Sequence, residues 1–418
     1  MIKSTIKPTF SHRIPFLDHL RGFAFLLMAI DHSLHGYALN WGRFWFYQDS
    51  ERSLVFDVFY MHDNSIIIPL LFFVIGTFVI PGMKEYRLKE YLKNRFFRYV
   101  VPFCIGVPLI VPILTYPRYV ANEAPGISYF DYWFRVFFQE KLQGGPFWVV
   151  YALLLYTLIA IALYGWLPKV FHLFASWVKW MIEKPFKGFA VFGLLCAVIL
   201  GVSDLLWGAP WWIGFGKLFY MQGSRFLQQA LFFFCGTAIG TLGYLENDKL
   251  WDPISRNWKL WGGLTLGLGA AYIGYSLTYF NDGAYDMSLI LHFYRGGTWT
   301  DVWPIFAQTA PGILIRTTLH AFFCLSQLVF FVGIFHHFFK KPTPFWTSLA
   351  ANGFGLFLIH EMIVVLCQFW LDGTTIPIFF KFLLVMSIGI GVAWALSNVL
   401  RKLPGFRLVM GTYPKQNS

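Results

Sequence analysis

The stretch RGFAFLLMAIDH, residues 21–32, decides the fold. It is an apolar run that begins with an arginine and ends with an Asp-His pair. It lies inside residues 16–38, which are long enough to cross a bilayer, since a span needs about 20 mostly apolar residues. Ionisable side chains are costly in hydrocarbon unless they are paired or hydrated, and they mark functional positions when they occur there. The stretch therefore predicts a first transmembrane helix that carries functional polar groups.

The composition places the whole chain in a membrane. Of its 418 residues, 57% are hydrophobic and 13% are charged, whereas soluble proteins carry roughly 25% charged residues. The net charge of +12 does not indicate nucleic acid, because the basic residues cluster beside apolar spans. The five cysteines lie in apolar runs without metal-binding spacing, so we expect neither disulfides nor a zinc site.

The apolar runs predict an all-α, polytopic integral membrane protein with about ten transmembrane helices. We expect one domain over residues 1–418, with short cytoplasmic tails at 1–15 and 401–418. The predicted spans are 16–38, 63–81, 97–116, 147–167, 188–207, 226–245, 259–280, 312–338, 347–370 and 376–400.

The distribution of basic residues predicts the orientation. Of the 33 Lys and Arg residues, 22 lie in segments on the N-terminal side and 8 lie in the segments opposite. Both termini should therefore be cytoplasmic. The loops 117–146 and 281–311 then face outward. Their aromatic residues are typical of an interfacial belt, or of a surface that stacks on sugar rings.

Arg21 and His32 share one face of the first predicted span. They are 11 residues apart, almost three turns, which separates them by about 16 Å along the axis. Arg21 would lie near the inner leaflet and His32 past the midplane. Histidine suits a general base or nucleophile because its pKa lies near neutral pH. The alternative is that Arg21 extends to lipid headgroups while His32 only bonds a neighbouring helix.

Two further groups surround His32 in the sequence. Asp31 is turned about 100° from His32 on a helix, and His35 follows Asp31 by four residues. That spacing suits a metal, but no third ligand is visible, so we expect none. His360 and Glu361 lie inside the ninth span, and Glu361 could orient a histidine across helices. The alternative is an interhelical hydrogen bond that only holds the bundle together.

Three other clusters are candidates for binding. Arg95 and Arg98 lie one turn apart at the cytoplasmic end of the third span and suit phosphate groups, although they also fit positive-inside anchoring. Arg316 and His320 share a face of the eighth span and could meet an acidic acceptor or extend to the interface. The segment 62–64, His-Asp-Asn, begins the second span and could cap its helix.

Several motifs resemble the acyltransferase-3 superfamily, integral membrane enzymes that O-acylate carbohydrates outside the cytoplasm. FLDHLRGFAFLLMAIDH is similar to the first span of that family, with its Arg-x10-His motif on Arg21 and His32. RFFR matches its RxxR motif on Arg95 and Arg98. GPFWVVYALL resembles the family region written HLWFL, with Trp148 retained and Pro146 in place of the histidine. ANGFGLFLIHEMIVV resembles the late span that carries a histidine, here His360. LLFFVIGTFV resembles the FFxISG stretch, without its Ser-Gly.

The resemblance implies acyl transfer from cytoplasmic acyl-CoA, as co-substrate, to a hydroxyl of an extracytoplasmic carbohydrate such as a glucan or lipopolysaccharide. It implies catalytic roles for Arg21, His32 and His360, CoA binding by Arg95 and Arg98, and retention of Trp148 at the substrate. From their positions in the spans, we expect Glu361 to be catalytic by tuning a histidine, and Asp31, Arg316 and His320 to contact the substrate. Within the superfamily, the chain looks nearest to the branch that succinylates periplasmic glucans, so the acyl group would be acetyl or succinyl. A bacterial inner membrane is then expected.

Two other functions use the same residues. A transporter or flippase of a glycan or acylated intermediate would use the buried His, Glu and Arg as a relay, but the sequence shows no inverted repeat. A non-catalytic partner of an envelope glycan machine would tolerate loss of His32.

Overall fold

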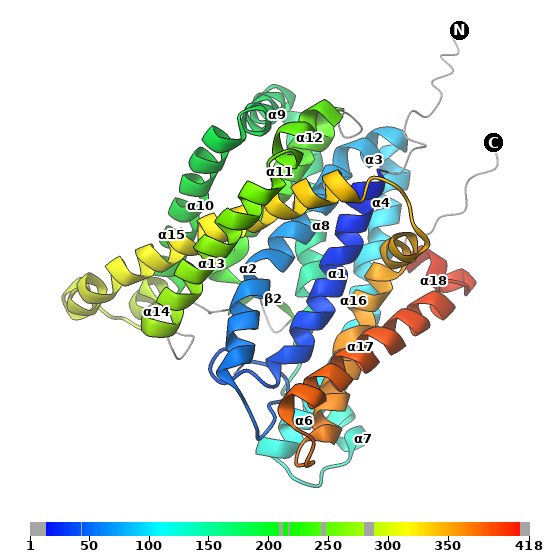
Figure 1. The fold of residues 1–418 in the computed structure, drawn as a ribbon. Coiled ribbons are helices and arrows are strands. Elements are labelled where there is room, and N and C mark those ends of the chain that lie inside the picture. Colours follow the sequence, from blue (N-terminus) through cyan, green and yellow to red (C-terminus); the bar gives the residue numbers. More distant parts are fainter. Residues whose placement is uncertain are drawn as a thin grey trace.

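The computed structural model describes residues 14–42, 44–208, 212–215, 218–243, 248–279 and 288–409. These residues form a bundle of helices (Figure 1). The helices are α1 (Pro15–His35), α2 (Leu54–Thr77), α3 (Val79–Glu85), α4 (Leu88–Arg95), α5 (Val101–Leu109), α6 (Val111–Asn122), α7 (Tyr129–Asp131), α8 (Trp148–Trp166), α9 (Pro168–Glu183), α10 (Pro185–Trp207), α11 (Gly223–Thr241), α12 (Asp248–Ser255), α13 (Trp258–Tyr279), α14 (Leu289–Tyr294), α15 (Trp299–Phe338), α16 (Pro344–Leu371), α17 (Ile378–Leu400) and α18 (Pro404–Val409).

The all-α membrane prediction is confirmed. Each predicted span falls on helical residues, and seven helical segments are long and apolar enough to cross a membrane. Helices α1, α11 and α13 are not among the seven. Of these, α1 carries ionisable residues and α11 carries Arg225, Gln228 and Gln229, which lower the mean hydropathy. The total of ten spans stays a prediction.

Several predicted boundaries are wrong. The segment 117–146, expected to be a loop, contains the end of α6, the short helix α7 and a π-helical turn over 132–137. Helix α2 begins at Leu54, where the Ser53 hydroxyl accepts a hydrogen bond from the backbone N–H of Val55. The segment 62–64 therefore lies inside the helix and caps nothing. Helix α15 begins at Trp299 with a capping box of Thr298 and Asp301, so residues 299–311 are helical where a loop was expected.

Among the described residues, four irregular elements interrupt the α-helices. Two of them, the π-helical turn η2 (Tyr132–Phe137) and the 3-10 turn η3 (Gly145–Phe147), lie between α7 and α8. A π-helical turn, η1 (Phe96–Val100), joins α4 to α5, and it carries Arg98. Such turns are frequent at functional sites. Between α10 and α11 lies a two-stranded antiparallel hairpin, β1 (Trp212–Phe215) with β2 (Phe219–Gln222), which the all-helical prediction did not contain.

Helix α1 lies at the centre of the bundle, between α2 and α16, and it also contacts α15 and α17 (Figure 1). Helices α2 and α11 approach each other closely at glycines. A Cβ atom on Gly236 would lie 2.0 Å from the carbonyl oxygen of Phe73, and one on Gly76 would lie 2.3 Å from that of Phe233. Small residues permit this approach, because packing rather than hydrophobic exclusion holds helices together in lipid.

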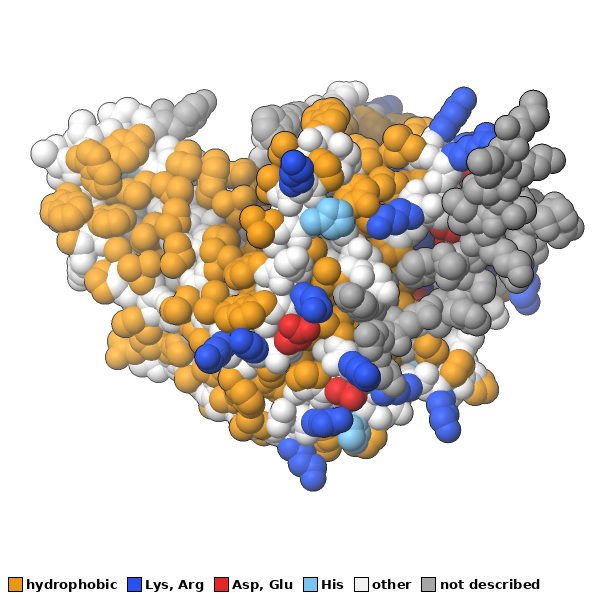
Figure 2. Space-filling model, turned by 90° about the horizontal axis from the view of Figure 1, so that it is seen from above, with side chains coloured by type: hydrophobic (Ala, Val, Ile, Leu, Met, Phe, Trp, Pro, Cys, Tyr) orange, Lys and Arg blue, Asp and Glu red, His pale blue; other side chains and the backbone are white. Residues whose placement is uncertain are grey.

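The end of the bundle at which α1 begins is rich in basic side chains (Figure 2). Lys and Arg gather over this end, with few Asp and Glu between them. Helix α17 ends toward the same side (Figure 1). Loop charges predict that this side is cytoplasmic, and the orientation stays a prediction.

Candidate active site

A cavity of about 630 Å³ surrounds the C-terminal half of α1. Four of the predicted site residues line it: Asp31, His32, Trp148 and Glu361. Its other walls come from the segment 36–53, the end of the loop 117–146, the hairpin and α11. The segment 36–53 follows the C-terminal end of α1, the hairpin follows that of α10, and α11 contributes its N-terminal part, all on the side opposite to the start of α1. The cavity therefore lies on the side predicted to face outward.

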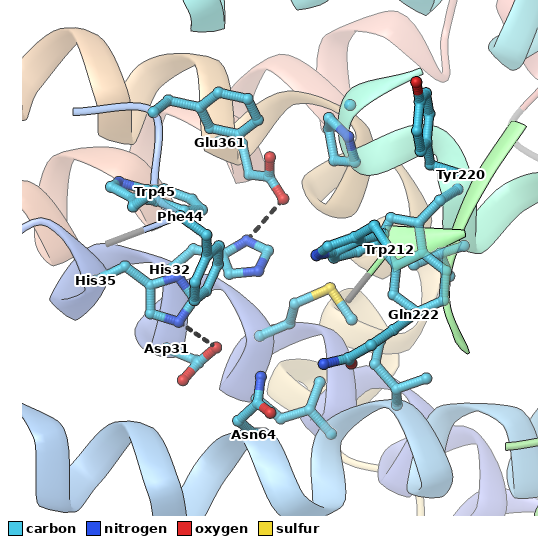
Figure 3. A pocket seen from close by; sticks show the side chains of 18 of the residues that line it. Asp31, His32, His35, Phe44, Trp45, Asn64, Trp212, Tyr220, Gln222 and Glu361 are labelled. Atoms are coloured by element: carbon cyan, nitrogen blue, oxygen red, sulfur yellow. Dashed lines mark ion pairs between the residues drawn. The ribbon is translucent and has the colours of Figure 1, made fainter. Parts of the chain in front are cut away.

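His32 is held by two side chains of α16. Its Nδ1 atom lies 2.9 Å from Nε2 of His360 and 2.8 Å from Oε1 of Glu361. The rings of His32 and His360 stack, with centroids 5.0 Å apart. His360 is fully buried, whereas the side chain of His32 is 17% exposed. His32 is therefore the histidine of the pair that a substrate can reach (Figure 3).

The surrounding acceptors determine where the protons lie. Nδ1 of His360 is 2.9 Å from the carbonyl oxygens of Leu356 and Phe357. Carbonyls only accept, so this nitrogen carries the proton, and Nε2 of the same ring accepts. Nδ1–H of His32 then lies between two acceptors, Nε2 of His360 and the carboxylate of Glu361, of which the carboxylate is the closer. Nε2 of His32 keeps its lone pair, which is the form of a general base.

Asp31 pairs with His35 on the same helix, at 3.0 Å between Oδ2 and Nε2. Ligand atoms of Asp31, His32 and His35 lie within 4.8 Å of one another, as do those of His32, His360 and Glu361. Each group therefore offers three possible ligands to a metal ion, whereas the sequence analysis found no third ligand. The expectation that the protein holds no metal stays a prediction.

Trp45 forms the wall beside His32, with ring centroids 5.1 Å apart. Its indole N–H donates to Oε1 of Gln368 at 2.7 Å, and the amide of Gln368 donates to the carbonyl of Ser33 at 3.1 Å. The indole is thus tied to both helices that hold the histidines. Sequence reasoning missed Trp45, because it lies in a loop without helical periodicity.

The segment 36–53 that carries Trp45 is anchored by buried charges. The carboxylate of Asp57 accepts hydrogen bonds from three successive backbone N–H groups, those of Leu39, Asn40 and Trp41. Asp49 pairs with Lys381 of α17 at 3.1 Å, and both side chains are buried. A buried pair of this kind needs both partners, so the segment is held in one conformation.

The hairpin supplies the opposite wall (Figure 3). Trp212 meets Trp148 edge to face with centroids 5.6 Å apart, and Tyr220 and Gln222 also line the cavity. Short aromatic runs flank Gly216-Lys217 in the sequence. This pattern is typical of a β-hairpin and could have predicted the hairpin.

The predicted phosphate-binding arginines lie outside this cavity, toward the basic end of the bundle. The guanidinium of Arg95 lies over the ring of Tyr91, 4.5 Å from its centroid, and that of Arg98 lies 5.3 Å from the ring of Phe354. Arg21 pairs with Asp18 at 2.9 Å, and its charge is close enough to act on Arg98. The structure thus groups Arg21 with the RxxR motif and not with His32.

Three phenylalanines separate the arginines from the cavity. Phe25, Phe354 and Phe357 pack with centroids 5.9 to 6.5 Å apart, and Phe357 lies 6.4 Å from the ring of His360. Phe357 lines the cavity, whereas Phe25 and Phe354 do not. We call these three residues the aromatic plug.

Arg316 and His320 lie in another buried cluster and do not line the cavity. Arg316 is 4.0 Å from Asp204 and lies over the ring of Trp41, at 5.1 Å. His320 meets the ring of Tyr272 edge to face, at 5.1 Å. Their role in substrate binding stays a prediction that this geometry does not support.

Comparisons with known proteins give one match. The profile of a family described as an acyltransferase domain matches residues 14–398, nearly the whole chain. Neither the curated proteins nor the solved structures give a match. The match covers both helices that hold His32, His360 and Glu361. The chain therefore belongs to this acyltransferase family, and the protein is a multi-pass membrane acyltransferase.

Proposed function

We propose that the protein transfers an acetyl or succinyl group from cytoplasmic acyl-CoA to a hydroxyl of a carbohydrate outside a bacterial inner membrane. The observation that carries this proposal is the base at His32. Its Nδ1–H is directed by His360 and Glu361, so that Nε2 is free in an aromatic-walled cavity.

In the proposed reaction His32 alone carries the proton from the sugar hydroxyl to the leaving thiolate. Nε2 takes the proton of the sugar hydroxyl while the hydroxyl oxygen attacks the thioester carbonyl. A C–O bond forms and the C–S bond breaks. The imidazolium then gives its proton to the leaving thiolate, which departs as free CoA thiol. The carboxylate beside Nδ1 stabilises the imidazolium between these steps.

The donor would bind at the basic end. Among the residues that the structure describes, neither Arg95 nor Arg98 forms an ion pair with a carboxylate. A phosphate would therefore displace no carboxylate there, although Arg95 also interacts with Tyr91 and Tyr99. Guanidinium groups bind phosphate oxygens bidentately. The pantetheine arm would pass the aromatic plug to bring the thioester to His32. In this arrangement the arginines hold the phosphates and only the thioester reaches the cavity, so the two arginines need not line it.

The acceptor would enter from the opposite side. Trp45, Trp148, Trp212 and Tyr220 offer aromatic faces around the cavity, and sugar rings present apolar C–H faces that such walls cover. A glucan, a lipopolysaccharide sugar or another envelope glycan would fit this chemistry. The cavity is open to the side that holds the hairpin and the loop 117–146.

The test is mass spectrometry of envelope glycans from cells that make the wild type or His32→Ala. We expect an alkali-labile mass increment with the wild type that is lost with His32→Ala. His172→Ala is the matched control, because His172 is exposed on α9. A normal increment with His32→Ala would refute the assignment of the base.

A second assay separates the enzyme from a transporter. Purified wild-type protein is given labelled acyl-CoA and an oligosaccharide, and release of CoA thiol is followed. We expect turnover, since a transporter or a non-catalytic partner releases no thiol. Absence of turnover with every donor and acceptor tried would count against the proposed reaction.

A further inference from the structure

Arg225 is a cation in the cavity that the proposed reaction does not use. It lies in the first turn of α11 and lines the cavity. Its Nη1 donates to both the backbone carbonyl and the side-chain oxygen of Asn64. Asn64 lies across the cavity from Glu361 (Figure 3). Among the described residues, Arg225 has no carboxylate partner.

Gln228 lies on the same face of α11, one turn further on. Its side chain is 1% exposed, and it also lines the cavity. The Nε2 atom of Gln228 has no hydrogen-bond partner among the described residues. A buried amide without a partner costs free energy, and an acceptor bound in the cavity would remove this cost.

The two groups together are suited to an anion. The remaining N–H groups of a guanidinium match the two oxygens of a carboxylate, and an amide N–H can bind one of the same oxygens. A neutral sugar hydroxyl would leave the positive charge without compensation in a partly buried site. The helix N-terminus next to Arg225 adds a favourable field for negative charge.

We propose that Arg225 and Gln228 form a subsite for a carboxylate of the substrate, inside the cavity that holds His32. The proposal rests on the acyltransferase function proposed above. The carboxylate has two possible sources. One is the far end of a dicarboxylic acyl group, such as succinyl. The other is an acidic sugar of the acceptor.

The turnover experiment compares substrates that differ in one charge. Purified protein is assayed with succinyl-CoA and with acetyl-CoA on a neutral glucan oligosaccharide, and with acetyl-CoA on an oligosaccharide that carries a uronic acid. We expect Arg225→Gln to lower kcat/KM roughly 10- to 100-fold for the substrate that bears the carboxylate, and by less than about twofold for its neutral counterpart. A loss confined to succinyl-CoA assigns the carboxylate to the acyl group, and a loss confined to the uronic acid assigns it to the acceptor. An equal loss on all three would overturn the proposal.

Two more variants test the subsite in case Arg225→Gln does not fold. Arg225→Lys keeps the charge and should keep part of the preference. Gln228→Glu places a carboxylate beside an intact Arg225, so the preference should disappear while neutral substrates still react. Lys141→Gln is the control, because Lys141 lies at the cavity edge but is already paired with Glu123 at 2.7 Å. Its ratio of charged to neutral substrate should stay within about twofold of the wild type.

A binding measurement separates this proposal from the proposed reaction. Ligand-observed NMR compares monomethyl succinate with the neutral dimethyl ester on wild type and Arg225→Gln. We expect the wild type alone to favour the monoester. If this preference is seen and no donor gives turnover, the subsite stands and the reaction fails. If the wild type binds both esters equally, the subsite is refuted whatever the turnover.

Discussion

Nδ1 of His32 donates to Nε2 of His360 across 2.9 Å, from α1 to α16. The proton on His360 is fixed in turn by two backbone carbonyls of its own helix. The tautomer of the exposed histidine is therefore set by two acceptors on a different helix, Nε2 of His360 and the carboxylate of Glu361 at 2.8 Å. The packing of the two helices thus fixes the proton at Nδ1 before any substrate arrives, as the general base of the proposed reaction requires.

His360→Phe keeps an aromatic ring against His32 but removes the acceptor. We expect kcat to fall roughly 10- to 100-fold with little change in KM, because Nδ1–H of His32 loses one of its two acceptors while the cavity keeps its shape. The pH–rate profile of the variant should also shift, which a purely structural defect would not cause. Unchanged kcat would show that the hydrogen bond has no role in catalysis.

Glu361→Gln keeps the side-chain volume and removes the charge. We expect a fall in kcat of roughly 10-fold or more, because an amide stabilises the imidazolium less well than a carboxylate. Initial rates across a range of pH test this expectation. The acidic limb should move to lower pH, since the protonated form of His32 loses its charged neighbour. A profile identical to that of the wild type would contradict the role of Glu361.

The double variant Arg95→Gln, Arg98→Gln should weaken CoA binding more than acceptor binding. Two guanidinium contacts to phosphate are lost, so we expect a rise in the dissociation constant of roughly 100-fold at low salt and less at high salt. Equilibrium binding of CoA measures it. Lys93→Gln is the control, because Lys93 lies in α4 beside Arg95 and is exposed. Equal affinities of the double variant and the control would argue against a CoA site here.

Gly236→Ala should destabilise the bundle where α2 and α11 meet. The new Cβ would lie 2.0 Å from a backbone oxygen that belongs to a helix and cannot move alone, so we expect a loss of roughly 1–3 kcal/mol. The midpoint of thermal unfolding in detergent reports it. Gly263→Ala, on α13, meets no atom within 4 Å and should leave the midpoint unchanged or higher. Similar midpoints for both variants would refute close packing at Gly236.

Lys381→Met should loosen the segment that carries Trp45. Asp49 would be left as an uncompensated buried charge, which costs about 3–5 kcal/mol. We expect a lower unfolding midpoint together with a higher KM for the acceptor. Adding Asp49→Asn should restore much of the stability. If the double variant is no more stable than Lys381→Met, the ion pair is not what holds this segment.

The sequence predicted those features of the site that repeat with helical periodicity. The apolar runs located the helices, and the buried polar residues within them pointed to His32 and Glu361. It could not show that His360 would stack on His32, because the crossing of α1 and α16 depends on side chains spread over both helices. The sequence also did not predict close packing at Gly236. A glycine in an apolar run does not show which backbone oxygen of another helix lies opposite to it.

The site residues that lie in loops and in the hairpin could not be predicted for a related reason. Trp45 reaches His32 because Asp57 and Lys381 fix its segment from two distant helices. The hairpin that carries Trp212 interrupts an otherwise helical chain, and its short strands have little signal of their own. Arg225 was counted only as a loop charge in the orientation argument. Its place beside Gln228 follows from where α11 begins, which the apolar run alone placed slightly later.

The aromatic plug has a consequence for the cell. A passage wide enough for a pantetheine arm would, if permanently open, let ions and protons leak down the membrane potential. Phe25, Phe354 and Phe357 contact one another, and the cavity is lined by Phe357 but not by the other two. If the donor follows the proposed route, these rings must move to admit it and must close again to prevent electrical leakage.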